Sequence, residues 1–289
     1  MKELHLNAYA KVNLGLDVVR RLENGYHEVK MIMQSIELFD RVTIKKTDQP
    51  GIHLSMNRED LPVDEGNIAY RAAALMMDRL PEGQGVDIYI EKNIPVAAGM
   101  AGGSTDGAAV LMGMNFIYGL KYSKDELMAL GLKLGADVPF CIMQGTALSE
   151  GIGEVLTRLP VMSDYYILVA KPPVSVSTKY VYQHLELNED TIHPDIDGMR
   201  EAIRKDDLDG VVSRMGNVLA TVTEKEHPEI IRLKELMMEG GAQGALMSGS
   251  GPTVFGIFKE KQQGDLAMAH VLESGITQEV YLVKPYGGV

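Results

Sequence analysis

A glycine-rich segment, residues 95–105, lies between a predicted strand and a predicted helix. It constrains the fold of this 289-residue chain more than any other feature. The run 86–90 alternates apolar and polar side chains, which predicts a strand, and a helical pattern begins near Ser104. Glycines let a backbone approach a bulky anion, and a helix N-terminus offers unpaired N–H groups and a positive dipole end. The segment therefore predicts a phosphate-binding loop, and the alternative is a tight structural turn before a capped helix.

The segment matches neither of the two common phosphate-binding motifs. A P-loop places a lysine after its last glycine, whereas Ser104 follows Gly103 here. The dinucleotide fingerprint G-x-G-x-x-G is also absent. Ser104 and Thr105 add hydroxyl groups that can cap the helix, bind a phosphate, or bind Mg²⁺ carried by phosphates.

The remaining pattern mixes strands and helices without a strict alternation. Dense turn residues predict a loop over 47–66, and a change of pattern near 150–163 predicts a boundary between a domain 1–155 and a domain 156–289. This mixture favours the α+β class over a doubly wound sheet. Strands are predicted over most of the first 45 residues and at 165–170, 253–258 and 279–283, and helices at 67–80, 123–134, 195–205, 207–221, 228–239 and 262–273.

Composition excludes several classes of function. The net charge is −12, from 28 basic and 40 acidic side chains, which disfavours binding to the phosphate backbone of a nucleic acid. The chain has no apolar run of membrane-spanning length and no signal peptide at its start. Its single cysteine, Cys141, allows no intramolecular disulfide and indicates a reducing compartment. These features predict a cytoplasmic protein with neither a membrane nor a nucleic-acid partner.

Four other places can carry chemistry, each with a structural alternative. Lys11 lies in the predicted first strand and is either a cation for a transferred phosphate or an exposed edge lysine. Asp137 follows a helix that a capping box opens, and is either a general base or a solvated aspartate. The segment 247–253 is either an anion-binding nest or a turn between strands. Tyr26 and His27, after the Asn24-Gly25 turn signal, either stack on a planar ligand or form a plain hairpin tip.

Together these motifs resemble the GHMP kinases. The family pattern Pro-x-x-x-Gly-Leu-Gly-Ser-Ser-Ala-Ala is similar to the segment that begins at Pro95. Four further motifs, found in the same order as in the family, extend the resemblance over nearly the whole chain: Ala10-Lys-Val-Asn-Leu14, Gly25-Tyr-His-Glu28, Gly135-Ala-Asp-Val-Pro-Phe140 and Leu246-Met-Ser-Gly-Ser-Gly-Pro-Thr-Val-Phe255.

The resemblance implies a fold and a reaction. The expected fold is the two-domain GHMP kinase fold, with an N-terminal domain like domain 2 of ribosomal protein S5 and a ferredoxin-like C-terminal domain. The expected reaction transfers a phosphoryl group from ATP, with Mg²⁺ carried by its phosphates, to a hydroxyl of a small-molecule alcohol. The members that the chain resembles most take an alcohol linked to cytidine diphosphate, in isoprenoid precursor biosynthesis. A monomer or weak homodimer is expected.

The resemblance also implies roles for individual residues. Asp137 is expected to act as the base near the accepting hydroxyl, and Lys11 as the cation beside the γ-phosphate. Asn67 is expected to contact adenosine. The residues expected to bind ATP phosphates are Pro95, Val96, Ala97, Ala98, Gly99, Met100, Ala101, Gly102, Gly103, Ser104 and Thr105. Those expected to bind the cytidine substrate are Asn13, Tyr26, His27, Thr178, Tyr182, Ser248 and Gly249.

Three positions depart from the family pattern. Ala101 stands where a glycine is common, Thr105 replaces a serine and keeps the hydroxyl, and Gly107 stands where an alanine is common. Alternative functions are another GHMP kinase of the homoserine or mevalonate type, or a non-catalytic nucleotide-binding protein of the same fold. The Gly-Tyr-His-Glu motif favours a nucleobase-containing substrate, since an aromatic ring beside an imidazole suits a base. Lys11 and Asp137 favour catalysis over binding alone.

Overall fold

A computed structural model describes residues 2–23 and 25–288. Asn24 of the predicted Asn24-Gly25 turn lies outside the described residues. The described part of this turn is closed by two backbone hydrogen bonds. The N–H of Gly25 donates to the carbonyl of Leu22 (3.0 Å), and the N–H of Leu22 donates to the carbonyl of Tyr26 (2.8 Å).

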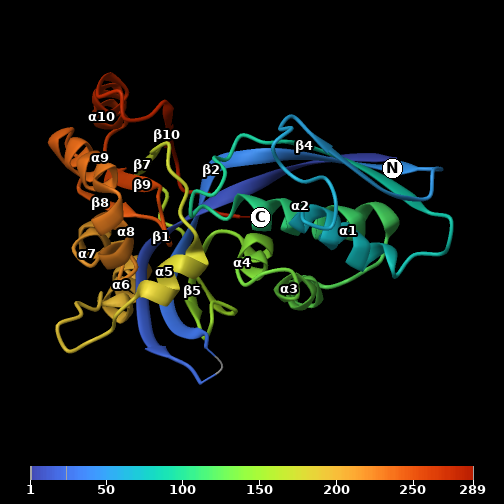
Figure 1. The fold of residues 1–289 in the computed structure, drawn as a ribbon, viewed down its shortest axis with the longest axis horizontal. Coiled ribbons are helices and arrows are strands. Elements are labelled where there is room, and N and C mark those ends of the chain that lie inside the picture. Colours follow the sequence, from blue (N-terminus) through green and yellow to red (C-terminus); the bar gives the residue numbers. More distant parts are fainter. Residues whose placement is uncertain (1, 24, 289) are drawn as a thin grey trace. The chain divides into compact units, whose positions relative to one another are not determined.

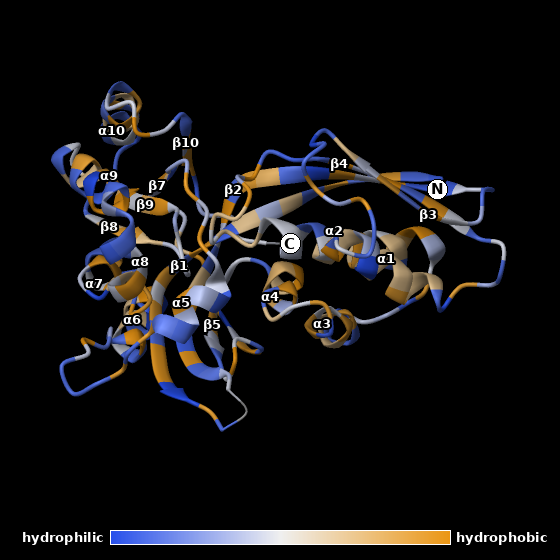
Figure 2. Ribbon diagram, viewed as in Figure 1, coloured by the Kyte–Doolittle hydropathy of each residue, from blue (hydrophilic) through white to orange (hydrophobic). Residues whose placement is uncertain are grey.

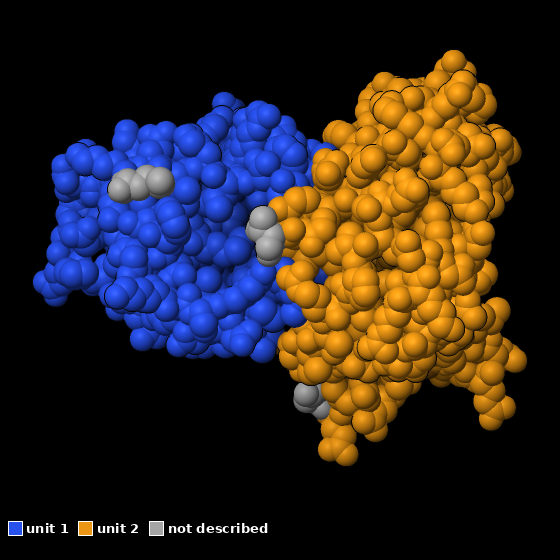
Figure 3. Space-filling view, turned by 180° about the vertical axis from the view of Figure 1, so that it is seen from behind, with its two compact units in different colours: residues 1–10, 38–94, 101–143 blue, residues 11–37, 95–100, 144–289 orange. Residues whose placement is uncertain are grey.

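The chain divides into two compact units, coloured separately in Figure 3. Unit 1 comprises residues 1–10, 38–94 and 101–143, and unit 2 comprises residues 11–37, 95–100 and 144–289. The chain therefore passes from one unit into the other several times. The predicted boundary between a domain 1–155 and a domain 156–289 stays a prediction. Contacts between residues instead define the two interleaved units.

Unit 1 packs helices on one face of a sheet (Figure 1). Residues 41–47 of β2 pair antiparallel with β4, and β4 pairs parallel with β3 in the register Gly51 to Gly85. The strands are β1 (Glu3–Arg21) and β2 (His27–Thr47), both of which continue into unit 2, with β3 (Gly51–Met56) and β4 (Gly85–Glu91). The helices are α1 (Ile68–Met77), α2 (Gly102–Tyr118), α3 (Lys124–Leu132) and α4 (Val138–Met143).

Apolar side chains from these strands and helices form one core in unit 1. Ile44 of β2 and Ile88 of β4 pack with Met76 of α1 and Leu111 of α2, and all four are buried. Cys141 is also buried in this cluster. Figure 2 shows hydrophobic positions along the strands and on α1, as the alternating and helical patterns predict.

Unit 2 contains further strands that continue the pairing of β2, and a separate four-stranded sheet. Residues 31–34 of β2 pair antiparallel with β5, and β5 pairs with β6. The separate sheet has the order β10-β7-β9-β8, with antiparallel neighbours. The strands are β5 (Thr146–Glu150), β6 (Val155–Leu159), β7 (Tyr166–Lys171), β8 (Gly244–Met247), β9 (Val254–Phe258) and β10 (Glu279–Val283).

The separate sheet has the topology predicted for the C-terminal domain. Its strands and the main helices packed on it, α9 and α10, follow the order β-α-β-β-α-β, which is the ferredoxin-like pattern. Among the described residues, no helix has the length and apolarity needed to cross a bilayer. The helices of unit 2 are α5 (Thr178–His184), α6 (Ile196–Arg204), α7 (Leu208–Val212), α8 (Ala220–Glu226), α9 (Pro228–Glu239) and α10 (Lys261–Glu273).

Two sequence predictions were wrong because tertiary pairing outweighed the local signal. The range 47–66, predicted as a loop, contains β3, which is held by its parallel pairing with β4. The helix predicted over 207–221 is broken into α7 and α8. The chain between them runs beside β1 instead, where Leu16 donates to the carbonyl of Gly216 (2.8 Å) and Val218 donates to the carbonyl of Leu16 (3.1 Å).

Candidate functional site

In unit 2, Lys11 is held against the glycine-rich segment. Its Nζ donates to Gly99 O at 3.1 Å and to Asn13 Oδ1 at 2.8 Å. Its backbone N–H also donates to the carbonyl of Met100 at 3.2 Å. Only 5% of Lys11 and 1% of Asn13 is exposed. These values exclude the exposed edge lysine, which was the alternative for this position.

The loop 248–253 between β8 and β9 joins the same group in unit 2. Ser248 Oγ donates to Gly99 O at 3.2 Å and accepts from the backbone N–H of Asn13 at 3.3 Å. Ser248 and Gly249 are buried. The structure thus brings β1, the segment 95–100 and the loop 248–253 together around one carbonyl oxygen, that of Gly99.

Only glycine fits at position 99. Its φ is +72°, a region that side-chain-bearing residues rarely adopt, and an added Cβ would collide with the carbonyl oxygen of Ser248. Ala97 and Ala101 also have positive φ, at 52° and 59°. Ala101, where the family pattern has glycine, therefore keeps the backbone conformation that glycine favours, and it bears the strain of an alanine in that region.

The remainder of the predicted phosphate segment lies in unit 1, at the N-terminus of α2. Ala101 is the N-cap residue and no side chain caps the helix, so Ser104 and Thr105 do not serve as caps. Thr105 donates its N–H to the carbonyl of Ala101 (2.9 Å) and its hydroxyl to the carbonyl of Tyr9 (2.7 Å). Both donors of Thr105 are thus used internally, which leaves the N–H groups of residues 102–104 as the donors that suit an anion.

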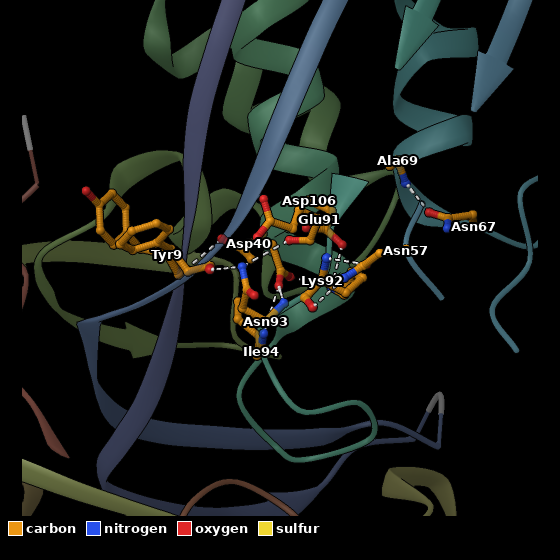
Figure 4. Close-up of polar contacts among 12 residues, drawn as sticks. Tyr9, Asp40, Asn57, Asn67, Ala69, Glu91, Lys92, Asn93, Ile94 and Asp106 are labelled. Atoms are coloured by element: carbon orange, nitrogen blue, oxygen red, sulfur yellow. Dashed lines mark hydrogen bonds and ion pairs between the residues drawn. The ribbon is translucent and has the colours of Figure 1, made fainter. Parts of the chain in front are cut away.

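A buried ion cluster, formed by Asp40, Lys92 and Asp106, lies in unit 1 beside the ends of this segment (Figure 4). Lys92 Nζ forms ion pairs with Asp40 Oδ2 and, at 2.7 Å, with Asp106 Oδ2. Their side chains are 5% or less exposed. Sequence reasoning gave none of the three a role, because a single charged residue in or beside a strand or helix resembles an ordinary surface residue.

The cluster shifts the titration of its members. Burial raises the pKa of Asp106 well above its ordinary value, and nearby Asp40 adds to this effect, while the Lys92 ammonium opposes it. Burial alone would lower the pKa of Lys92, but the two carboxylates outweigh burial and raise it. Two carboxylates share one ammonium, and among the described residues Asp106 Oδ1 has no hydrogen-bond partner.

Asn67 has a structural role at the start of α1. Its Oδ1 accepts from the backbone N–H of Ala69 at 2.9 Å, which makes it the N-cap of the helix. Its Nδ2 donates to the carbonyl of Pro62 at 2.8 Å. The predicted contact of Asn67 with adenosine stays a prediction.

Asp137 lies in unit 1, directly before α4. Its carbonyl oxygen accepts from the N–H of Cys141 at 3.0 Å, so its backbone begins the helix, and its side chain is half-buried. Val138, the next residue, is already the first residue of α4. Pro139 fits in the first turn, where a missing N–H costs no hydrogen bond.

In unit 2 the predicted cytidine-binding residues include two rings that lie against each other at a tilt. His27 and Tyr182 have ring centroids 5.1 Å apart and an interplanar angle of 33°. Tyr180 instead stacks on His184, and its hydroxyl donates to Glu226. The structure thus brings Tyr182, rather than Tyr180, to His27.

The exposed ring of Tyr26 is next to His27 in the chain, with 61% of its surface accessible. Burial lowers the pKa of His27, and the neighbouring charge of Arg21 lowers it further, so the imidazole is neutral at pH 7.

Two further polar residues of unit 2, Asn217 and Thr223, hold the loop 248–253 and were missed from the sequence. Asn217 Nδ2 donates to the carbonyls of Met247 (2.8 Å) and Gly249 (2.7 Å). The hydroxyls of Ser250 and Thr178 lie 2.8 Å apart, and Thr223 Oγ1 donates to the carbonyl of Ser250 at 3.1 Å. Thr178, a predicted substrate residue, is therefore linked to this loop. The turn residues of 248–253 were a visible signal, but their distant partners were not.

Comparison with known proteins identifies the family. Residues 67–145 match the family model "GHMP kinases N terminal domain", and residues 193–276 match "GHMP kinases C terminal". The chain is 52% identical to the 4-diphosphocytidyl-2-C-methyl-D-erythritol kinase of Lachnoclostridium phytofermentans, over 99% of this chain and 95% of that protein. The match in sequence therefore extends over both proteins almost completely.

Solved structures agree with the sequence match. A crystal structure of 4-(cytidine 5'-diphospho)-2C-methyl-D-erythritol kinase superposes with a TM-score of 0.84 and 31% identity, over 99% of this chain and all of that one. A homoserine kinase from Cytophaga hutchinsonii superposes with a TM-score of 0.80 at 19% identity, over 100% of this chain and 96% of that one, which is a likeness of fold alone. The predicted two-domain α+β fold is confirmed, and the chain belongs to the GHMP kinase family of ATP-dependent small-molecule kinases.

Proposed function

We propose that this protein transfers the γ-phosphoryl group of ATP to the 2-hydroxyl of 4-diphosphocytidyl-2-C-methyl-D-erythritol. The products are the 2-phosphate and ADP, and the step belongs to non-mevalonate isoprenoid precursor biosynthesis. The observation that carries the proposal is the buried Lys11 ammonium, 3.1 Å from the Gly99 carbonyl oxygen of the glycine-rich segment. A buried cation held at a predicted phosphate loop suits a reaction in which negative charge moves.

In the proposed reaction, Asp137 accepts a proton and Lys11 stabilises negative charge. The oxygen of the accepting hydroxyl forms a bond to the γ-phosphorus while the bond to the β–γ bridging oxygen breaks, and ADP leaves. The hydroxyl proton passes to the Asp137 carboxylate. Lys11 stabilises the charge on the γ-phosphoryl oxygens. Because phosphoryl transfer depends mainly on positioning and charge neutralisation, orienting the hydroxyl is the larger part of the work of Asp137.

The proposed ATP-binding residues are 95–105 and Asn67. The N–H groups of residues 102–104 suit the phosphates, since both donors of Thr105 are used within the protein. Mg²⁺ is proposed to arrive on the ATP phosphates, where it neutralises charge. The donor set fits this arrangement, because the Ser104 hydroxyl at the start of α2 is an oxygen ligand of the kind Mg²⁺ accepts.

The proposed cytosine-binding residues are Tyr26, His27 and Tyr182. The ring pair of His27 and Tyr182 and the exposed Tyr26 ring offer planar surfaces to a base. The neutral imidazole of His27 can both donate to and accept from the polar edge of cytosine. Further proposed contacts with the substrate come from Asn13, Thr178, Ser248 and Gly249, each of which belongs to the loop 248–253 of unit 2 or forms a hydrogen bond with it.

We also propose a cytoplasmic location and a monomer or weak homodimer. A single buried cysteine, Cys141, suits a reducing compartment. The acidic net charge of −12 supports the expectation that neither a nucleic acid nor a membrane surface is a partner.

The proposed function is tested by supplying ATP, Mg²⁺ and one alcohol at a time to the purified protein and measuring ADP. The cytidine substrate is expected to give ADP and its 2-phosphate, while homoserine and mevalonate give neither. Turnover of mevalonate or homoserine in place of the cytidine substrate would contradict the proposal. Binding of ATP without ADP from any of the three would favour a non-catalytic nucleotide-binding protein.

A further inference from the structure

The cluster of Asp40, Lys92 and Asp106 holds the chain on both sides of the glycine-rich segment. Asp40 Oδ1 accepts from the backbone N–H groups of Asn93 and, at 2.8 Å, Ile94, the residues directly before the segment. Asp106, directly after the segment, is bound to Lys92 Nζ at 2.7 Å. Lys92 Nζ also pairs with Asp40. The two ends of residues 95–105 are therefore tied to the same three side chains.

Close backbone packing and a second side chain support this connection. A Cβ added to Gly102 would lie 3.3 Å from Ile94 Cγ2 and 3.5 Å from Lys92 Nζ, so the start of α2 lies against the strand end. Asn57 fixes the backbone of Lys92 from another direction. Its Oδ1 accepts from the N–H of Lys92 at 2.8 Å, and its Nδ2 donates to the Lys92 carbonyl at 3.3 Å.

A structural role alone accounts poorly for this cluster. Buried ion pairs are often no more stable than apolar residues of similar volume, because desolvation offsets the attraction between the charges. This cluster also buries two carboxyl groups beside one ammonium and leaves Asp106 Oδ1 without a partner among the described residues. Hydrogen bonds and ion pairs are directional, so they fix the relative positions of the atoms that they join, which apolar contacts do not do.

We propose that Asp40, Lys92 and Asp106 are positioning residues that fix both ends of residues 95–105 in the shape that binds the ATP phosphates. The inference rests on the proposed ATP-dependent function. The cluster acts through the backbone and need not contact the nucleotide. Preformed N–H donors at the start of α2 lower the cost of ordering the segment when phosphate binds.

The test compares variants at Asp106 with a neighbouring control. Asp106→Ala removes the bond to Lys92, whereas Asp106→Asn keeps a side-chain oxygen for it. Lys92→Arg keeps a buried cation but changes its length and shape, and it provides a second variant that retains the charge. The control is Glu91→Gln, adjacent to Lys92, which breaks an exposed pair with Arg41 (3.4 Å) on the same strands.

Amide hydrogen exchange of the full chain without nucleotide is the first measurement. Asp106→Ala and Lys92→Arg are expected to speed exchange of the hydrogen-bonded amides at the two ends of the segment, those of Asn93, Ile94 and Thr105, by about tenfold, with little change elsewhere. Asp106→Asn should restore most of the protection, and Glu91→Gln should leave it unchanged. Unchanged exchange of these three amides in both disruptive variants, or an equal increase along the whole chain, would overturn the positioning role.

Kinetics then separate this inference from the proposed function. Asp106→Ala is expected to raise KM for ATP by about tenfold and to leave KM for the alcohol unchanged. A fall in kcat alone, with KM for ATP unaltered, indicates loss of folded enzyme and refutes the inference. If the wild-type protein forms no ADP, but exchange of these three amides responds as expected, the proposed function fails while the positioning role of Asp40, Lys92 and Asp106 stands.

Discussion

The side-chain ammonium of Lys11 and the carbonyl oxygen of Gly99 lie 3.1 Å apart although 88 residues separate them in the chain. The same carbonyl accepts a hydrogen bond from Ser248, so the position of residue 99 determines how β1 and the loop 248–253 meet the glycine-rich segment. A substitution that moves this carbonyl should therefore disturb all three.

Gly99→Ala is expected to destabilise the protein by about 1–3 kcal/mol, because φ is positive and the added Cβ collides with the Ser248 carbonyl. Chemical denaturation measures the change. The control is Gly103→Ala, where an added Cβ meets its nearest neighbour at 3.6 Å, an ordinary contact. That change should be neutral or stabilising in the first turn of α2. Equal stability losses in the two variants would contradict the close approach at residue 99.

Asp137→Ala is expected to lower kcat by about 10²–10⁴-fold, since the carboxylate is the proposed acceptor of the hydroxyl proton. Binding of a non-hydrolysable ATP analogue, measured by calorimetry, should change little. Asp125→Ala on α3 removes an exposed carboxylate from the same unit and is the control, with kcat unaltered. Near-normal kcat in Asp137→Ala would remove Asp137 from the catalytic role.

Tyr26→Ala is expected to raise KM for the cytidine substrate by roughly 5- to 150-fold, which corresponds to the ~1–3 kcal/mol of a base stacked on an aromatic ring. The ring is mostly exposed, so the thermal midpoint of unfolding should hardly move. Tyr180→Ala is the matched control, because Tyr180 stacks on His184 and is not placed beside His27. An equal rise in KM in both variants, or none in Tyr26→Ala, would argue against the proposed base-binding role of Tyr26.

The KM for the cytidine substrate is expected to rise as the pH falls, with the midpoint of the rise below about 6.5, the ordinary pKa of histidine. Burial and Arg21 lower the pKa of His27, so the imidazole is protonated at a lower pH than an ordinary histidine. KM should rise only at lower pH, where protonation removes the acceptor nitrogen. In His27→Gln the low-pH rise should disappear, and KM for ATP serves as the reference. A rise centred above pH 7 would contradict the lowered pKa.

The stability of Asp106→Asn relative to wild type should increase from about pH 4 to about pH 8. The pKa of Asp106 is raised in the folded protein, so its carboxyl favours folding at pH values below its unfolded pKa. That contribution is lost as the pH rises through the folded pKa. Asparagine does not titrate and escapes this loss. Thermal unfolding midpoints of both proteins across the range measure the effect, and a difference independent of pH would contradict the raised pKa.

Local chemistry in the sequence predicted local structure well. The capping box at Ser123 and Glu126 is present, with Glu126 Oε2 accepting from the N–H of Ser123 at 2.8 Å. Its two residues are only three positions apart in the chain, so no contact with a distant segment is needed to recognise it. The phosphate segment was likewise visible because its glycines, strand and helix follow one another directly.

Burial of polar residues could not be predicted in the same way. Lys11 and Asn13 alternate with apolar residues as the outer face of an exposed strand does, yet both are buried. Asn217 lies where a helical pattern continues, but its amide is bound to carbonyls 30 and 32 residues away. These environments depend on which segments pair in three dimensions, and a single sequence does not specify those pairings.

The interleaving of the two units has a consequence for how this protein can be divided and recombined. The polypeptide changes unit after residues 10, 37, 94, 100 and 143, so no single cut releases either one intact. A fragment ending at residue 155 would carry β1, β2 and β5 but lose most of β6, the strand that covers the outer edge of β5. Exchange of halves between related genes by one crossover would face the same obstacle. The two compact units therefore have to be inherited and exchanged together, as one stretch of gene.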